Sequence, residues 1–349
     1  MTPQCDIIIP VYNQVDITLT CLTALIQHTD KRHPIWIVDD CSRESDFERL
    51  KAHVAQYPHI RVLRRPENGG FSATVNYGIE RTTSEYICLL NNDTEVTSGW
   101  LETLLDHLTL HPDIGIVNPA SNQFKFTPEE SSAAPPDSRI LMNGATGFCM
   151  VFKRDITHKI GLFDTIYGRG YYEDTDFCYR ARKMLGLRTA IVLNAFVYHW
   201  ESQSFGRKSK ERYALKRRNH EIFSNRWGIE NRFLFLVPQK NESLFRKHFD
   251  SCCRLADNRN RITVITNAKR LFTDIHNPFT GSLPHHGNIK SMYIGLPFLP
   301  VFAFSFLKWI TSGKRYSKLL VFTKRVNGPG DNPMFVAADN YHRALANLL

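Results

Sequence analysis

The stretch Tyr86-Ile87-Cys88-Leu89-Leu90-Asn91-Asn92-Asp93 decides the fold, because an apolar run ends abruptly in a polar, acidic turn. A continuous apolar run of this length predicts a strand that is buried on both faces of a sheet. Similar runs occupy residues 6–10, 34–38 and 60–63, and helical periodicity separates them over residues 15–28, 45–56 and 72–81. This alternation predicts an α/β fold with a mostly parallel sheet flanked by helices.

Ligands of such sheets bind beyond the carboxyl ends of the strands. Asp39, Asn68 and Asp93 each follow a predicted strand, so we expect them at one edge of the sheet. A passage rich in Pro, Ser and Ala over residues 127–138 predicts a loop between two halves of the domain. Further along, the pattern predicts strands at 146–152, 190–198, 233–238 and 262–265, and helices at 173–185, 211–227 and 240–257.

The bulk composition is that of a globular protein, with 42% hydrophobic and 22% charged residues among 349. A formal net charge of +10 indicates an anionic partner, such as nucleic acid, anionic lipid or a sugar nucleotide. The cysteines show neither zinc-site spacing nor a disulfide framework, and no signal-peptide pattern opens the chain. We therefore expect a cytoplasmic protein.

An apolar stretch at residues 292–309 is marginal in length for a spanning helix and is interrupted by Pro297 and Pro300. The stretch contains Lys308, and further cations follow it without an intervening acidic residue: Lys314, Arg315, Lys318, Lys324 and Arg325. This combination favours peripheral contact with the cytoplasmic face of a membrane. Packing of the stretch onto the rest of the protein is the alternative.

The acidic cluster Glu173-Asp174-Thr175-Asp176 opens a predicted helix, where backbone N–H groups favour carboxylates. A well-capped helix explains such a cluster equally well. Asp176 and Arg180 are four apart, which predicts a structural ion pair. A second acidic turn ends at Asp93 and His199 ends a later strand, so carboxylates and an imidazole lie at element ends, as a metal-assisted displacement requires.

Six ordered motifs together resemble those of the inverting family 2 glycosyltransferases with the GT-A fold, over roughly residues 5–230. They are Ile8-Ile9-Pro10-Val11-Tyr12-Asn13, Val38-Asp39-Asp40-Cys41-Ser42, Asn68-Gly69-Gly70-Phe71-Ser72, Leu89-Leu90-Asn91-Asn92-Asp93, Glu173-Asp174-Thr175-Asp176 and His199. The resemblance implies a GT-A domain over residues 1–230, with a nucleotide-binding half (1–118) and an acceptor half (119–230). We expect residues 231–349 to form a mainly helical extension that associates with the membrane.

The resemblance also assigns roles to the nucleotide-binding half. The loop of Pro10, Val11 and Tyr12 would lie against the base, and the Asp39 carboxylate can accept from a pyrimidine N–H or a ribose hydroxyl. Further nucleotide contacts are expected from Asn68, Gly70, Asn91 and Asn92. Each of these turns also reads as an ordinary cap or tight turn when it is taken alone.

Asp93 and His199 are expected to hold a divalent cation, Mn²⁺ or Mg²⁺, that bridges the donor diphosphate. Asn91 stands where the family has the first aspartate of its Asp-x-Asp motif, so that position supplies no charge. Asp174 is the expected general base. Glu173 would contact the acceptor or raise the pKa of Asp174, while Tyr172 and Trp200 would bind the acceptor.

The sequence therefore predicts transfer of a sugar from a nucleotide-diphosphate sugar, of UDP-hexose or dTDP-rhamnose type, to a hydroxyl of a cell-surface glycan or lipid-linked oligosaccharide. A nucleotidyltransferase is disfavoured because no Gly-rich, basic loop follows the first strand. A nucleic-acid-binding protein is disfavoured because the carboxylates would repel phosphates. A catalytically inactive scaffold that binds sugar nucleotides stays open because of Asn91.

Overall fold

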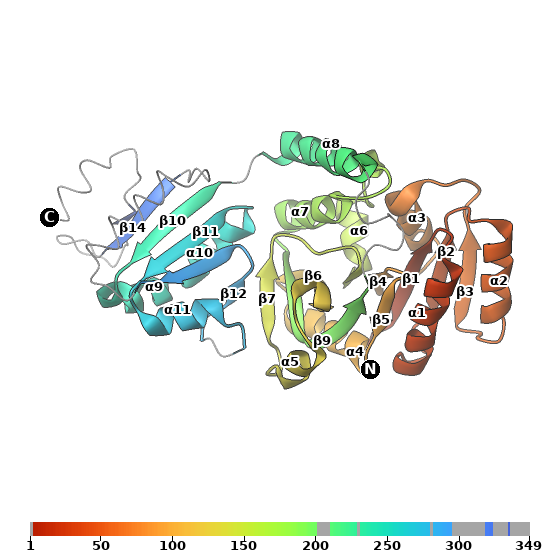
Figure 1. The fold of residues 1–349 in the computed structure, drawn as a ribbon, viewed down its shortest axis with the longest axis horizontal. Helices are drawn as coiled ribbons and strands as arrows, with labels where there is room; N and C mark the ends of the chain where they lie inside the picture. Colours follow the sequence, from red (N-terminus) through yellow and green to blue (C-terminus); the bar gives the residue numbers. More distant parts are fainter. Residues whose placement is uncertain are drawn as a thin grey trace. The chain divides into compact units, whose positions relative to one another are not determined.

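The computed structural model describes residues 3–200, 210–228, 231–279, 282–294, 318–323 and 334–335. Two compact units make up the chain, and each is built from two segments of sequence. Unit 1 consists of residues 1–138 and 144–228, and unit 2 consists of residues 139–143 and 229–349. Figure 1 traces the elements of both units along the chain.

Unit 1 is built on a sheet with the strand order β9-β6-β8-β4-β1-β2-β3. Neighbouring strands are parallel except β8, which runs antiparallel to both β4 and β6. The bounds are β1 Cys5–Val11, β2 Ile35–Asp39, β3 Ile60–Arg64, β4 Tyr86–Leu90, β6 Ile114–Ala120, β8 Cys149–Lys153 and β9 Arg188–His199. The short strand β5 (Thr94–Val96) pairs antiparallel with β9.

Helices flank this sheet (Figure 1), and their bounds are α1 Val15–His28, α2 Glu44–Val54, α3 Gly70–Ile79, α4 Trp100–Leu110, α5 Pro128–Ala133, α6 Arg154–Ile160, α7 Glu173–Leu185 and α8 Lys210–Trp227. Short 3₁₀ helices cover Asn122–Phe124 (η1) and Thr165–Tyr167 (η2). A buried cluster that includes Ile8, Leu89, Phe152 and Phe177 joins β1, β4, β8 and α7. Since a buried apolar side chain of this size contributes about 1.5–3 kcal/mol, this cluster anchors α7 to the sheet.

The first four predicted strands and three predicted helices are confirmed to within two residues at each end. The helix over 173–185 is also confirmed, and Gly186 ends it in the left-handed conformation. The predicted loop over 127–138 is partly wrong, because it contains α5. Thr127 and Glu130 form a reciprocal capping box there, with Pro128 at the first helical position.

Unit 2 contains four parallel strands in the order β13-β11-β10-β14, with β15 antiparallel to β14. Unit 2 also contains β7 (Arg139–Met142), which pairs in parallel with β12 (His285–His286). The other bounds are β10 Arg232–Val237, β11 Arg261–Thr266, β13 Ile289–Tyr293, β14 Lys318–Thr323, β15 Met334–Phe335, η3 Gln239–Asn241, α9 Glu242–Lys247, α10 Phe249–Asp257 and α11 Lys269–His276.

The prediction of a mainly helical extension is therefore wrong for the described part of unit 2. Short apolar runs such as Phe233–Val237 pair with strands far along the chain. The periodicity of the sequence does not reveal such pairing. The predicted helix over 240–257 is interrupted at His248, between α9 and α10. Most of the apolar stretch 292–309 and all of its following cations except Lys318, which opens β14, lie outside the described residues.

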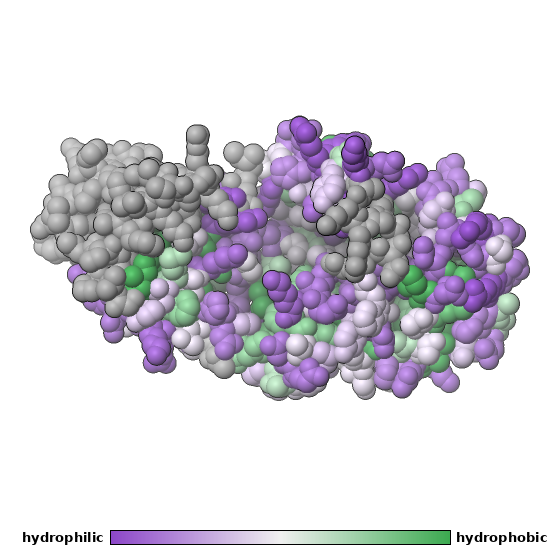
Figure 2. All heavy atoms as spheres, in the orientation of Figure 1, coloured by the Kyte–Doolittle hydropathy of each residue, from purple (hydrophilic) through white to green (hydrophobic). Residues whose placement is uncertain are grey.

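Within the described residues, no helix combines the length and the apolar character that crossing a membrane requires. Figure 2 shows hydrophilic residues over α8, whose Lys216, Arg217 and Arg218 are exposed. Arg217 pairs with Glu221 on the same helix, and Arg218 donates to the carbonyl of Ile166. The basic helix is thus largely a solvated face of unit 1.

Candidate active site

Pairing between β5 and β9 brings Asp93 to His199. Thr94 lies opposite His199 in this ladder, and His199 Nε2 lies 3.2 Å from Asp93 Oδ1. Asp93 is buried, and its Oδ1 accepts no hydrogen bond. A buried carboxylate oxygen that lacks a donor and faces an imidazole nitrogen fits a divalent cation, which both groups can ligate.

The ring of His199 is held in one orientation by residues that the sequence did not indicate. Its Nδ1 lies 2.9 Å from Gln123 Oε1 in η1, and the ring stacks on Phe148 with centroids 4.9 Å apart. Asn122 accepts from the His199 amide and donates to its carbonyl. These contacts orient the ring so that Nε2 faces Asp93. Hydrogen-bond partners of metal-ligating histidines commonly orient the ring in this way.

The turn before α7 is held in a rare backbone conformation. Tyr171 and Tyr172 have φ values of 71° and 77°, a region that non-glycine residues seldom occupy. The buried Asn219 side chain on α8 donates to the carbonyls of Tyr167, Gly170 and Tyr171. These bonds fix the direction in which the first turn of α7 leaves the loop.

Two carboxylates of that first turn differ in exposure, because Glu173 is buried and Asp174 is half-buried. Asp174 accepts from the amides of Thr175 at 2.6 Å and Gly147 at 3.0 Å, while Glu173 Oε2 accepts no hydrogen bond. Burial raises the pKa of Asp174 above its ordinary value, despite the lowering effect of these N–H donors. Burial, followed by the charge of Asp174, raises the pKa of Glu173 to about 8.

The dipeptide Gly147-Phe148 contacts three parts of the site: the acidic turn, His199 and the first turn of α7. The Gly147 amide donates to Asp174, the Phe148 carbonyl accepts from the Asn91 amide at 2.7 Å, and the Phe148 ring stacks on His199. A Cβ on Gly147 would lie 3.1 Å from Phe71 Cζ, so the position is tightly packed. One short segment therefore sets the acidic turn, the imidazole and the first turn of α7 relative to one another.

The neighbouring aspartates Asp39 and Asp40 have different surroundings. Asp40 accepts from the amides of Gly69 and Gly70 and pairs with Arg65, so it holds the glycine turn. Asp39 accepts from the Ser42 amide through Oδ2, whereas its buried Oδ1 accepts no hydrogen bond. Burial raises the pKa of Asp39, as expected for a carboxylate that lacks sufficient donors.

The remaining predicted nucleotide contacts lie around this edge. Val11 is in register with Asp39, which places the end of β1 beside the end of β2, and Tyr12 beyond it is 53% exposed. Gly70 has φ 76°, and a Cβ there would lie 2.8 Å from Arg169 Cα. The side-chain amide of Asn92 donates to the Thr18 hydroxyl on α1, so this group has its partner within the fold. Pro10, another predicted position, is in register with Val38. The side-chain amide of Asn68 donates to the Asp40 carbonyl.

The two aromatic residues predicted for acceptor binding differ in exposure. Tyr172 is partly buried against Phe223, with centroids 5.3 Å apart. Trp200 is 54% exposed and stacks on Tyr198, and its amide donates to the Asp93 carbonyl. Trp200 thus has an exposed ring and a backbone that lies next to Asp93, whereas the Tyr172 ring mainly contributes to packing.

The predicted ion pair between Asp176 and Arg180 is confirmed, with Nε 2.9 Å from Oδ2. Asp176 is fully buried and also accepts from Tyr167, Arg226 and Trp227. This carboxylate therefore ties α7 to α8 and η2.

Comparison with known proteins places the first part of the chain in a family. Residues 6–161 match the model of the family described as "Glycosyl transferase family 2". The glycosyltransferase YibD of Escherichia coli (strain K12), named as uncharacterized, is 33% identical over 137 residues, which are 39% of each chain. The uncharacterized protein Rv1525 of Mycobacterium tuberculosis (strain ATCC 25618 / H37Rv) is 30% identical over 207 residues, 55% of this chain and 74% of that protein.

The match to GlyG of Streptococcus pneumoniae covers 35% of that protein, so this chain spans between a third and two fifths of the length of two named glycosyltransferases. Among solved structures, GalNAc-T7 with UDP, GalNAc and Mn²⁺ superimposes with a TM-score of 0.54 at 14% identity, over 65% of this chain and 48% of that one. This likeness shows that the fold is GT-A. The chain belongs to glycosyl transferase family 2.

Proposed function

We propose that this protein is a metal-dependent, inverting glycosyltransferase. It moves a sugar from a nucleotide-diphosphate sugar, of UDP-hexose or dTDP-rhamnose type, to a hydroxyl of a cell-surface glycan or lipid-linked oligosaccharide. The observation that carries the proposal is the convergence of Asp93, His199 and Asp174 around Gly147-Phe148. The matched family region ends at residue 161, so the roles of Asp174 and His199 rest on this geometry.

The donor's nucleotide would lie along the ends of β1 and β2. Asp39 Oδ1 is buried without a donor, which suits an N–H of a base or a hydroxyl of a ribose. The exposed ring of Tyr12 can stack on the base. Asp93 and His199 would hold Mn²⁺ or Mg²⁺, and such an ion supplies positive charge to the departing diphosphate. GalNAc-T7, whose fold is similar, was crystallised with UDP and Mn²⁺.

Asp174 would accept the proton of the acceptor hydroxyl as that oxygen attacks the sugar from the face opposite the diphosphate. Attack from that face inverts the configuration at the anomeric carbon. The raised pKa of Asp174 makes its carboxylate a stronger base near neutral pH. The Gly147 and Thr175 amides keep the carboxylate oriented. Trp200 would bind an acceptor sugar through its exposed ring face.

The test uses a panel of UDP-, GDP- and dTDP-sugars, with and without Mn²⁺, and measures donor binding together with slow donor hydrolysis. We expect Mn²⁺-dependent binding of at least one donor. For that donor, Asp174→Asn should lower the rate of sugar transfer by about 10²- to 10⁴-fold and leave donor binding unchanged. Asp155→Asn is the matched control, because Asp155 is exposed on α6.

Absence of Mn²⁺-dependent binding to every donor would disprove the proposal. Equal loss of donor binding and transfer in Asp174→Asn would show that the carboxylate is structural. Donor binding without hydrolysis or transfer to any acceptor would favour an inactive scaffold, the alternative that Asn91 leaves open.

We also propose that the protein is cytoplasmic and contacts the inner face of a membrane through residues 292–325. This proposal rests on the sequence alone, on the apolar stretch and the cations that follow it. A chain that ends after residue 294 should lose binding to vesicles of anionic phospholipid that the full chain binds. Unchanged vesicle binding by the shortened chain would contradict this part of the proposal.

A further inference from the structure

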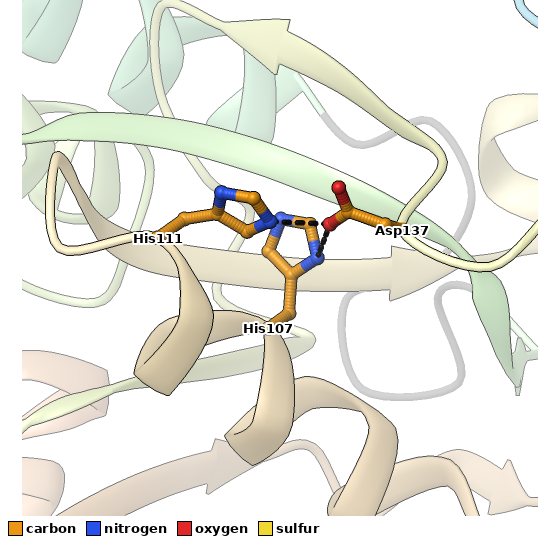
Figure 3. Close-up of side chains that lie close together, drawn as sticks. All are labelled: His107, His111 and Asp137. Carbon is orange, nitrogen blue, oxygen red and sulfur yellow. Dashed lines mark hydrogen bonds and ion pairs between the residues drawn. The ribbon is translucent and has the colours of Figure 1, made fainter.

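A second cluster of metal-ligating side chains lies in unit 1, built from residues other than the candidate active-site groups. His107 is in the last turn of α4, and His111 directly follows that helix, so their spacing of four places them on the same side. Asp137 comes from the turn after α5, where its φ is 67°. Figure 3 shows both imidazole rings directed at this carboxylate.

The two histidines converge on one oxygen atom. His107 Nδ1 lies 3.4 Å from Asp137 Oδ1, and His111 Nε2 is hydrogen-bonded to the same oxygen. The ring centroids of the two histidines are 4.6 Å apart. One potential ligand atom from each residue lies within 4.8 Å of the other two. Among the described residues, no other three His, Cys, Asp or Glu side chains meet this condition.

From this arrangement we propose a binding site for a divalent transition-metal ion of the zinc type at His107, His111 and Asp137. Imidazole nitrogen and carboxylate oxygen are the ligands that Zn²⁺ takes in tetrahedral sites. Bonds of about 2.0–2.1 Å in a tetrahedron separate neighbouring ligand atoms by roughly 3.3 Å, which the separation of His107 Nδ1 and Asp137 Oδ1 already matches.

The three side chains differ in solvent exposure, in a way that suits such an ion. The His107 side chain is 3% exposed, which gives one ligand a fixed position inside the fold. The side chains of His111 and Asp137 are 20% and 48% exposed, so an ion has a path of entry and a water molecule can complete the coordination. Two histidines favour zinc over Mg²⁺, which prefers oxygen ligands.

The ion would act as a structural clamp. It would join the end of α4 to the turn that leads from α5, two segments 26 residues apart in sequence. The backbone of that turn is also attached to β9, because the Leu193 amide donates to the Ser138 carbonyl. The bound ion would therefore stabilise unit 1 against local opening of residues 134–138 and would take no part in sugar transfer.

The test uses the full chain after removal of metals by a chelator. Zn²⁺ is titrated in competition with a chromophoric chelator, with excess Mg²⁺ present to occupy oxygen-rich sites. His111→Gln and Asp137→Asn should bind Zn²⁺ at least tenfold more weakly than the unmodified protein. Asp113→Asn is the matched control, because it removes a charge two residues beyond His111 from an exposed position. Asp93→Asn removes the carboxylate of the other metal site.

Zn²⁺ should raise the melting temperature of the unmodified protein, Asp113→Asn and Asp93→Asn, but not that of His111→Gln or Asp137→Asn. Both substituted side chains are partly exposed, so their own melting curves show whether each variant is folded. Zn²⁺ affinity unaltered by His111→Gln and Asp137→Asn would overturn the proposal. Loss of Zn²⁺ binding in Asp93→Asn alone would overturn it too, by placing the ion at the active site.

Discussion

Asp93 keeps a carboxylate oxygen without a hydrogen-bond donor although the side chain is buried. A buried acceptor in this state lowers stability by about 1–3 kcal/mol, so the fold tolerates an unfavourable group at the end of β4. Asp39 Oδ1 and Glu173 Oε2 are buried acceptors of the same kind. Three such oxygens among the predicted site residues are what a ligand-binding edge requires, because bound ligand groups would satisfy them.

Metal removal tests this reading of Asp93. We expect Mn²⁺ to raise the melting temperature of the protein in the presence of a donor nucleotide, and a chelator to reverse the increase. Asp93→Ala should abolish the Mn²⁺-dependent increase without lowering the melting temperature of the metal-free protein, because it removes an unsatisfied buried oxygen. An undiminished response to Mn²⁺ in Asp93→Ala would exclude this carboxylate as a ligand.

Gln123 is a positioning residue, since it holds His199 Nδ1. Gln123→Ala should weaken the apparent Mn²⁺ affinity of the protein by about 10- to 100-fold, as measured from the Mn²⁺ dependence of donor binding. Gln123→Glu retains an oxygen acceptor and should restore much of that affinity. If both variants bind Mn²⁺ as tightly as the unmodified protein does, the contact with His199 does not orient a metal ligand.

Glu173 gives a pH-dependent stability whose sign follows from its pKa. The folded protein raises that pKa from 4.5 to about 8, so the folded state binds more protons than the unfolded state between these values. The free energy of unfolding therefore falls as pH rises through this window, by at most about 1.4 kcal/mol per pH unit from one group. Glu173→Gln should make this decline shallower in urea denaturation between pH 5 and 8. An identical slope in both proteins would contradict the assignment.

At the scale of elements, the turn before α7 depends on α8 through Asn219. Asn219→Ala removes the donors to three carbonyls around Tyr171, whose backbone conformation is itself unfavourable. We expect a loss of about 3 kcal/mol in the free energy of unfolding. Sugar transfer should fall further than the folded fraction does, because Glu173 and Asp174 begin the helix that follows.

Asn225→Ala is the matched control for this change, since Asn225 is exposed on the same helix. It should alter neither stability nor transfer beyond about 0.5 kcal/mol. A stability loss of the same small size in Asn219→Ala would show that the turn keeps its conformation without α8.

Local sequence signals predicted α7 well, because Glu173 to Leu185 combines first-turn acids with a glycine that ends the helix. The capping box of α5 is also a local signal, but the surrounding Pro and Ser residues indicate a loop more strongly. The meeting of Asp93 with His199 depends on β5, a three-residue strand whose partner lies about a hundred residues later. No local pattern encodes that pairing, and the same holds for Gln123 and Gly147.

At the scale of the whole molecule, one unit includes two segments that are far apart in the sequence, and no change in amino-acid composition marks where they begin. Residues 139–143 belong to unit 2, although unit 1 precedes and follows them in the chain. There β7 pairs with β12, and the Gly287 amide donates to the Leu141 carbonyl. A boundary placed near residue 230, as the resemblance implies, therefore separates β7 from β12, with which it pairs.

Truncation at two positions tests this organisation. A chain that ends after residue 228 lacks β12, so the backbone groups of β7 that face it lose their partners and open more readily. A chain that ends after residue 294 keeps β12 and β13 and serves as the control. Under limiting trypsin, we expect cleavage at Arg139 to be faster in the shorter chain than in the control or the full chain. Equal cleavage rates in the two truncated chains would mean that β7 is held without β12, and residues 139–143 would then be better assigned to unit 1.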